Sequence, residues 1–206
     1  MRTEVLSTTS SNTYQHAVDV LQNSGVVAFP TDTVYGLAAL VADETAIRRL
    51  YGIKERSPAR AIAILLGDIA DLEEVALPLG KAVQKLARRF WPGPLTLVLP
   101  RQPTVSDLLT SDQTIGVRIP AHPVALKLLR LTGPLAVTSA NLTDQPNTIT
   151  ASEVLSQLGG RVHLVLDGGP APGKLPSTVV DATQDSVNIL REGPISAQDL
   201  KAALEA

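Results

Sequence analysis

The chain has 206 residues, a formal net charge of −2 and a hydrophobic content of 44%. This length suits a single domain, with a sizeable core built mainly from aliphatic side chains because only 3% of the residues are aromatic. The chain has no cysteine, which excludes disulfides and thiolate chemistry, and its weak net charge argues against indiscriminate binding of nucleic acid.

The sequence also argues against a metalloprotein and against a secreted or membrane protein. His16, His122 and His163 are far apart and lack the spacing of metal ligands. Residues 1–12 are polar, without the apolar core of a secretory signal. No apolar run approaches the roughly 18 residues that a membrane helix needs. We therefore expect a cytoplasmic protein without a metal site of its own.

In the first third of the chain, helical and strand patterns alternate. An apolar stripe predicts a helix over residues 14–23, and the four apolar residues 26–29 are typical of a short strand buried on both faces. An Asp at the start predicts a helix over 43–51. The basic segment 52–60 contains a proline and is interpreted as a loop, and the apolar run 61–66 predicts another buried strand.

The same alternation continues to the end of the chain. The predicted elements are a helical region over 71–90 with an interruption at 78–80, a strand at 95–99, a strand at 116–120, a helix over 123–131, a strand at 135–141, a helix over 151–158, strands at 162–166, 178–180 and 187–190, and a terminal helix over 196–206 opened by a capping box of Ser196 and Asp199. This order predicts one layered α/β domain over residues 1–206, with its main part at about 12–195. We expect a twisted sheet of mixed parallel and antiparallel strands, helices on its faces and a ligand cleft at strand ends.

Polar residues gather where the first buried strand ends. Thr31, Asp32, Thr33 and Tyr35 supply three hydroxyls and a carboxylate directly after that strand. Open α/β sheets bind ligands at the carboxyl ends of their strands. This segment therefore predicts a binding site.

Two further segments, 138–141 and 177–181, carry small hydroxyl and amide side chains beside predicted strands. They fit either the same site or ordinary turns. Lys54 and Arg56 fit either a polyphosphate site or a solvated basic face, and Arg191 either an anion contact or a surface position.

Arg118 stands between Val117 and Ile119 on a predicted half-buried strand. Burial of a lone guanidinium costs several kcal/mol, so Arg118 needs an anionic partner. The partner is either an internal carboxylate, for instance that of Asp181, or a bound anion.

The segment 168–175 has the glycine and lysine spacing of a phosphate-binding P-loop. Leu175 stands where a P-loop needs Ser or Thr, and a strand rather than a helix is predicted next. We interpret it as a Gly/Pro-rich loop beside the site.

Together these residues predict one cleft rich in cations and hydroxyls. No nucleophile–His–acid set and no paired carboxylates stand out. Such a cleft would bind and orient anionic reactants and stabilise charge, so no single catalytic residue is assigned; the orientation falls to Lys54, Arg56 and Arg118.

Seven ordered motifs indicate a family. They are residues 29–37 (FPTDTVYGL), 54–56 (KER), 91–96 (WPGPLT), 117–120 (VRIP), 139–141 (SAN), 177–181 (STVVD) and 189–193 (ILREG). Over roughly residues 12–195 the chain resembles the YrdC-like L-threonylcarbamoyladenylate synthases, in their single-domain form.

The resemblance implies an enzyme that condenses L-threonine, bicarbonate or carbon dioxide, and ATP into threonylcarbamoyl-AMP and pyrophosphate, with Mg²⁺ carried by the triphosphate. The product would pass to a tRNA threonylcarbamoyl transferase that modifies adenosine 37 of tRNA. The resemblance places threonine contacts at Thr31, Arg118, Thr138 and Ser177, and ATP contacts at Lys54, Arg56, Ser139, Asn141, Asn147 and Arg191.

The chain departs from the family pattern after the KER motif. Ser57 replaces a common proline, Ala61-Ile62 replaces Pro-Leu, and Leu65 replaces a histidine. Two other functions stay open: a module that binds tRNA or double-stranded RNA through the basic loop and the segment 81–89, and a sensor that binds threonine or nucleotide without chemistry.

Overall fold

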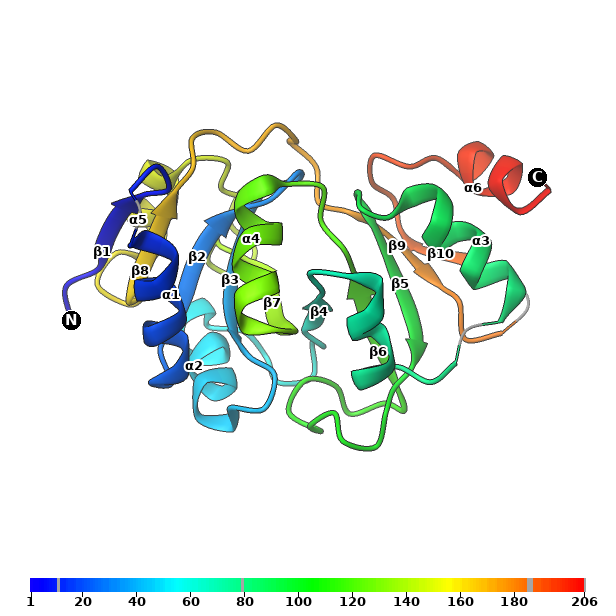
Figure 1. The fold of residues 1–206 in the computed structure, drawn as a ribbon, viewed down its shortest axis with the longest axis horizontal. Coiled ribbons are helices and arrows are strands. Elements are labelled where there is room, and N and C mark those ends of the chain that lie inside the picture. The colour runs from blue at the N-terminus through cyan, green and yellow to red at the C-terminus, as the bar shows by residue number, and fades with distance from the viewer. Residues whose placement is uncertain (11, 79, 185–186, 206) are drawn as a thin grey trace.

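The computed structural model describes residues 1–10, 12–78, 80–184 and 187–205. Their strands form one sheet that runs through the whole molecule (Figure 1). In spatial order the strands are β1 (Glu4–Ser7), β8 (Leu164–Asp167), β2 (Val27–Pro30), β3 (Tyr35–Leu40), β7 (Leu135–Ser139), β4 (Ala63–Leu65), β6 (Thr114–Arg118), β5 (Leu95–Pro100), β9 (Thr178–Asp181) and β10 (Asn188–Arg191).

The sheet mixes strand directions, as predicted. The pairs β1–β8, β8–β2, β4–β6 and β5–β9 are parallel, and the other neighbouring pairs are antiparallel. The spatial order also places strands from the second half of the chain between strands from the first half, which brings distant segments together.

Helices cover both faces of the sheet. They are α1 (Thr13–Gln22), α2 (Glu44–Lys54), the 3₁₀ helix η1 (Ile69–Glu74), α3 (Lys81–Phe90), α4 (Pro123–Thr132), α5 (Ala151–Leu158) and α6 (Ala197–Glu205). Helices α1 and α4 pack against each other over one apolar cluster, and α3 and α6 lie together near β9 and β10 (Figure 1). None of the helices in the described ranges is long and apolar enough to cross a bilayer.

Strand β2 shows why the apolar run at residues 26–29 was informative. Val27 and Phe29 enter the apolar cluster under α1 and α4, whereas Val26 and Ala28 enter the cluster on the opposite face. All four side chains are fully buried. Because successive side chains of a strand point to opposite faces, a run without polar residues indicates two buried faces.

Helix ends follow their capping signals. The Asp43 side chain accepts a hydrogen bond from the Ala46 amide at 2.9 Å at the start of α2. Ser196 and Asp199 form the predicted reciprocal bonds, with the Asp199 amide 3.2 Å from Ser196 Oγ and the Ser196 amide 3.0 Å from Asp199 Oδ2. Residue 206, included in the predicted terminal helix, lies outside the described residues.

Two predicted elements are corrected. Residues 52–54 are the last residues of α2 and not a loop, so Lys54 is helical. The predicted helical region over 71–90 is corrected in its first half, where the 3₁₀ helix η1 ends at Glu74 and a bridge between Ala76 and Arg101 follows before α3 begins. The predicted interruption at 78–80 includes Leu79, which lies outside the described residues.

Candidate functional site

A cavity of about 310 Å³ lies where segments from both halves of the chain meet. It is lined by parts of strands β3, β4, β5, β6, β7 and β9 and by the turn after β2. Most of the predicted site residues line it: Thr31, Arg56, Arg118, Thr138, Ser139, Asn147, Ser177 and Arg191. The structure thus brings together residues that span most of the sequence.

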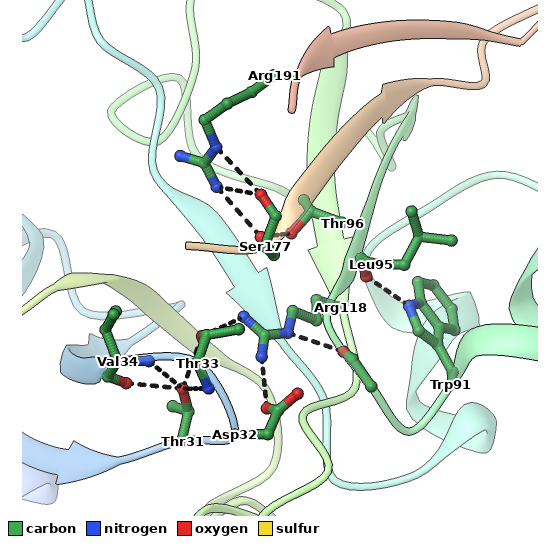
Figure 2. A network of polar contacts seen from close by, with 11 residues as sticks. Thr31, Asp32, Thr33, Val34, Trp91, Leu95, Thr96, Arg118, Ser177 and Arg191 are labelled. Carbon is green, nitrogen blue, oxygen red and sulfur yellow. Dashed lines mark hydrogen bonds and ion pairs between the residues drawn. The ribbon is translucent and has the colours of Figure 1, made fainter. Parts of the chain in front are cut away.

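Arg118 ends strand β6, and its side chain is almost fully buried at the cavity (Figure 2). Its Nε donates to the Gly93 carbonyl at 3.0 Å, its Nη1 donates to Thr33 Oγ1 at 3.0 Å, and its Nη2 pairs with the Asp32 carboxylate. The internal ion pair therefore exists, but with Asp32 and not with Asp181. Because a guanidinium has five N–H groups, two of them have no partner among the described residues and remain for a ligand.

The turn after β2 is built by its own hydroxyls. Thr31 Oγ1 donates to the Val34 carbonyl at 2.7 Å and accepts from the Thr33 and Val34 amides at 3.2 and 3.3 Å. Such side-chain bonds to nearby main-chain groups hold a chain in a tight turn. Both Thr31 and Thr33 line the cavity. The sequence predicted a polar segment here, but it did not predict that Thr33 contacts Arg118 directly.

Ser177 connects strand β5 with the end of β10. Its hydroxyl lies 2.7 Å from Thr96 Oγ1 on β5 and accepts from Arg191 Nη2 at 3.1 Å. Arg191 also donates through Nε and Nη2 to the Ser177 carbonyl, at 3.1 and 2.9 Å. Thr96 was not among the predicted site residues, although it belongs to the WPGPLT motif that carries the family resemblance.

Guanidinium groups dominate the charge of the cavity. Burial, followed by the positive charge of Arg118, lowers the pKa of Arg191. Burial is also the main cause that lowers the pKa of Arg56, and the charges of Arg60 and Arg191 add to it. Among the described residues that line the cavity, Arg56, Arg118 and Arg191 are cationic and none is acidic. The arrangement therefore favours anionic ligands.

Lys54 and Asn141 lie behind the cavity wall rather than on it. Lys54 is 2% exposed, and its Nζ donates to the carbonyls of Ser139, at 2.5 Å, and of Asn141. The Asn141 side chain donates to the carbonyls of Leu142 and Gln145. Lys54 holds the end of β7 at Ser139, which lines the cavity, and both residues hold the segment that follows this strand.

The residues that depart from the family pattern contribute an apolar part of the wall. Ala61, Ile62 and Leu65 all line the cavity. Their side chains offer no hydrogen bonds, so this side of the cavity can bind a ligand only by apolar contact or through main-chain groups.

The Gly/Pro-rich segment 168–175 packs on the turn after β2. A Cβ atom at Gly173 would lie 2.6 Å from Thr33 Cα and 2.7 Å from the Asp32 carbonyl oxygen, so the two backbones are in direct contact. The Tyr35 hydroxyl donates to the Gly169 carbonyl at 2.7 Å. The following element is strand β9, which confirms that this segment is not a P-loop.

The fold and the cavity define an open α/β protein with a cationic cavity against its sheet. The cavity is not confined to strand ends as predicted, because Val98 and Gly116 line it from within β5 and β6. The sequence model of the Sua5/YciO/YrdC family, described as "Telomere recombination", matches residues 19–193. The chain belongs to this family, which confirms the resemblance seen in its motifs.

Named relatives agree with this assignment. The chain is 38% identical over 205 residues to a threonylcarbamoyl-AMP synthase of Bacillus subtilis, covering 98% of this chain and 59% of the relative. It is 37% identical over 189 residues to a putative threonylcarbamoyl-AMP synthase of Mycobacterium tuberculosis, covering 91% of this chain and 87% of the relative. A crystal structure of P. abyssi Sua5 complexed with L-threonine superimposes with a TM-score of 0.93 at 33% identity, covering 98% of this chain and 61% of that chain. The chain thus spans about three fifths of two of these proteins and most of the third.

Proposed function

We propose that this chain condenses L-threonine, bicarbonate or carbon dioxide, and ATP into threonylcarbamoyl-AMP and pyrophosphate. The single observation that carries the proposal is the convergence of Arg56, Arg118 and Arg191 on one cavity without an acidic residue in its described lining. Relatives named threonylcarbamoyl-AMP synthase support it, as does the relative crystallised with L-threonine.

Arg118 binds the carboxylate of L-threonine. Asp32, Thr33 and Gly93 hold three of its N–H groups and so fix the plane of the guanidinium. Its two remaining N–H groups suit a carboxylate, which accepts paired bonds from arginine. Ser177 and Thr138 supply hydroxyls around the amino acid, and Thr31 shapes the turn that carries Thr33.

ATP occupies the part of the cavity near Arg56 and Arg191, with Ser139 and Asn147 as polar contacts. Lys54 and Asn141 serve the nucleotide indirectly, because their hydrogen bonds set the position of the segment that begins at Ser139. Mg²⁺ enters on the triphosphate as part of the substrate. Without acidic side chains in its described lining, the cavity suits a cation held by phosphate oxygens rather than by protein carboxylates.

The chemistry consists of two steps that concentrate negative charge in the cavity. The neutral amine of threonine adds to the carbon of carbon dioxide and loses a proton, which forms an N-carboxylate. An oxygen of this carbamate then attacks the α-phosphorus of ATP, and the bond to pyrophosphate breaks. Fixed guanidinium groups reduce the repulsion in both steps and stabilise the charge of the leaving pyrophosphate.

The product serves the threonylcarbamoyl modification of tRNA adenosine 37. Its transfer to a tRNA threonylcarbamoyl transferase, weak binding of tRNA or double-stranded RNA, and a cytoplasmic location belong to the same proposal.

The test is mass detection of threonylcarbamoyl-AMP after the purified protein is mixed with ATP, Mg²⁺, L-threonine and bicarbonate. Pyrophosphate release should require all of these substrates, and reactions that omit one of them are the controls. ATP consumption that is indifferent to L-threonine would contradict the proposal, and high RNA affinity with no product would favour the RNA-binding alternative.

A further inference from the structure

Thr33 lies at the cavity beside Arg118, in the turn that follows strand β2. Its Oγ1 is 3.0 Å from Arg118 Nη1 and 3.0 Å from Thr31 Oγ1. Figure 2 shows that these contacts continue to the main-chain carbonyl of Val34. The direction of each bond follows from the hydrogens and lone pairs that the groups possess.

The two ends of the chain of bonds are fixed by chemistry. A guanidinium has only donors, so Arg118 Nη1 donates to Thr33 Oγ1. A carbonyl oxygen can only accept, so Thr31 Oγ1 donates its hydrogen to Val34 at 2.7 Å. Because Thr31 has a single hydroxyl hydrogen, the contact between the two hydroxyls is a bond donated by Thr33 to Thr31.

Because of these directions, the two hydroxyls differ in their remaining capacity to form a hydrogen bond with a ligand. Thr31 Oγ1 accepts from the Thr33 hydroxyl and from the Thr33 and Val34 amides, so both its hydrogen and its lone pairs are used. Thr33 Oγ1 has used its hydrogen and one lone pair, which leaves one lone pair. At this position the turn therefore offers a ligand an acceptor and no donor.

We propose that Thr33 recognises a hydrogen-bond donor of the amino acid whose carboxylate Arg118 binds, an inference that rests on the proposed function. L-Threonine carries two donors close to its carboxylate, the α-amine and the β-hydroxyl. A ligand that presents only an acceptor here leaves two acceptors facing each other, which is unfavourable in a buried site. A bond accepted from a neutral amine also leaves the nitrogen lone pair free to attack carbon dioxide.

The test compares ligands that differ in their donors, titrated by calorimetry without ATP. L-Threonine has both groups, L-2-aminobutyrate lacks the hydroxyl, (R)-3-hydroxybutyrate lacks the amine, and butyrate lacks both; weak ligands are measured in competition with L-threonine. We expect Thr33→Val to weaken L-threonine binding about tenfold and butyrate binding less than about twofold. Thr33→Ser, which keeps the hydroxyl, should restore most of the lost affinity.

The ligand series also identifies the donor. If the donor is the amine, Thr33→Val should weaken the binding of L-2-aminobutyrate and leave the binding of (R)-3-hydroxybutyrate unchanged. If the donor is the hydroxyl, the two ligands should show the reverse result. Thr132→Val is the matched control, because in the part of the chain that the structure describes Thr132 Oγ1 contacts main-chain carbonyls at the end of α4 and no residue of the cavity. Its affinities should equal those of the wild-type protein.

Two results would overturn the assignment of Thr33 without overturning the proposed function. The first is an unchanged affinity for L-threonine in Thr33→Val. The second is an equal loss of affinity for L-threonine and for butyrate, which would mean that Thr33 acts only by holding Arg118. In both cases the wild-type protein still makes threonylcarbamoyl-AMP. A wild-type protein that neither binds L-threonine nor makes the product would overturn the proposed function and this assignment with it.

Discussion

Arg118 and Asp32 are 86 positions apart in the sequence and form an ion pair at the cavity, with side chains only 7% and 10% exposed. Asp32 Oδ2 is buried without a hydrogen-bond partner among the described residues. The carboxylate therefore depends on Arg118 for its compensation. The pair joins the turn after β2 to strand β6 and holds the guanidinium at the cavity wall.

This dependence predicts the behaviour of Arg118→Ala. Removal of one partner leaves a buried, uncompensated carboxylate, so the free energy of unfolding should fall by about 3–5 kcal/mol in urea titrations. The double variant with Asp32→Asn should regain much of this loss but should not recover threonine-dependent pyrophosphate release. A single variant as stable as the wild type, or a double variant with normal turnover, would contradict the assignment of Arg118.

Arg56→Gln should raise the apparent KM for ATP about tenfold while the KM for L-threonine stays within about twofold, because Arg56 faces the proposed phosphate end of the cavity. Arg60→Gln is the control. Arg60 carries the same charge nearby but is 53% exposed in a surface pair with Asp144, so both KM values should be unaffected. Equal effects of the two substitutions would indicate that Arg56 acts through the general positive potential of this region and not through direct contact with ATP.

The burial of Lys54 should make the stability of the protein depend on pH. Burial, followed by the positive charge of Arg56, lowers the pKa of Lys54 from 10.5 to about 7 in the folded protein. Between these values the unfolded chain binds more protons, so the contribution of Lys54 to stability rises with pH. The free energy of unfolding of the wild type relative to Lys54→Met should therefore increase from pH 7 towards pH 10.5. A difference that is flat with pH would show that the carbonyl partners keep Lys54 charged.

Gly173→Ala should damage the site through the backbone. Its Cβ would lie 2.6 Å from Thr33 Cα, so the segment 168–175 or the turn after β2 must move. We expect lower thermal stability and weaker L-threonine binding by calorimetry. Gly52→Ala is the control, because its Cβ meets nothing within 4 Å and alanine favours the helix α2 by roughly 0.5–1 kcal/mol. Unchanged threonine affinity in Gly173→Ala would contradict the prediction.

Most elements were predictable where their local signals were strong. Strand β2 was recognised by its unbroken apolar run and helix α2 by its cap at Asp43. Strand β3 (Tyr35–Leu40) was missed because small residues such as Gly36, Ala38 and Ala39 have weak strand preference, and its position between β2 and β7 makes it a strand. Strand β1 was missed because it is largely exposed and has no apolar pattern.

The amino-acid sequence by itself determined the α/β alternation, the motif order that marks the family, and the stock of hydroxyl and guanidinium groups, since these depend on local composition and spacing. Only the tertiary structure decided which of these groups meet. It gave Arg118 the partner Asp32, placed Lys54 behind the wall, and made Thr33 the neighbour of the guanidinium. Such contacts join residues more than eighty positions apart. They depend on the strand order of the sheet, which local periodicity does not encode.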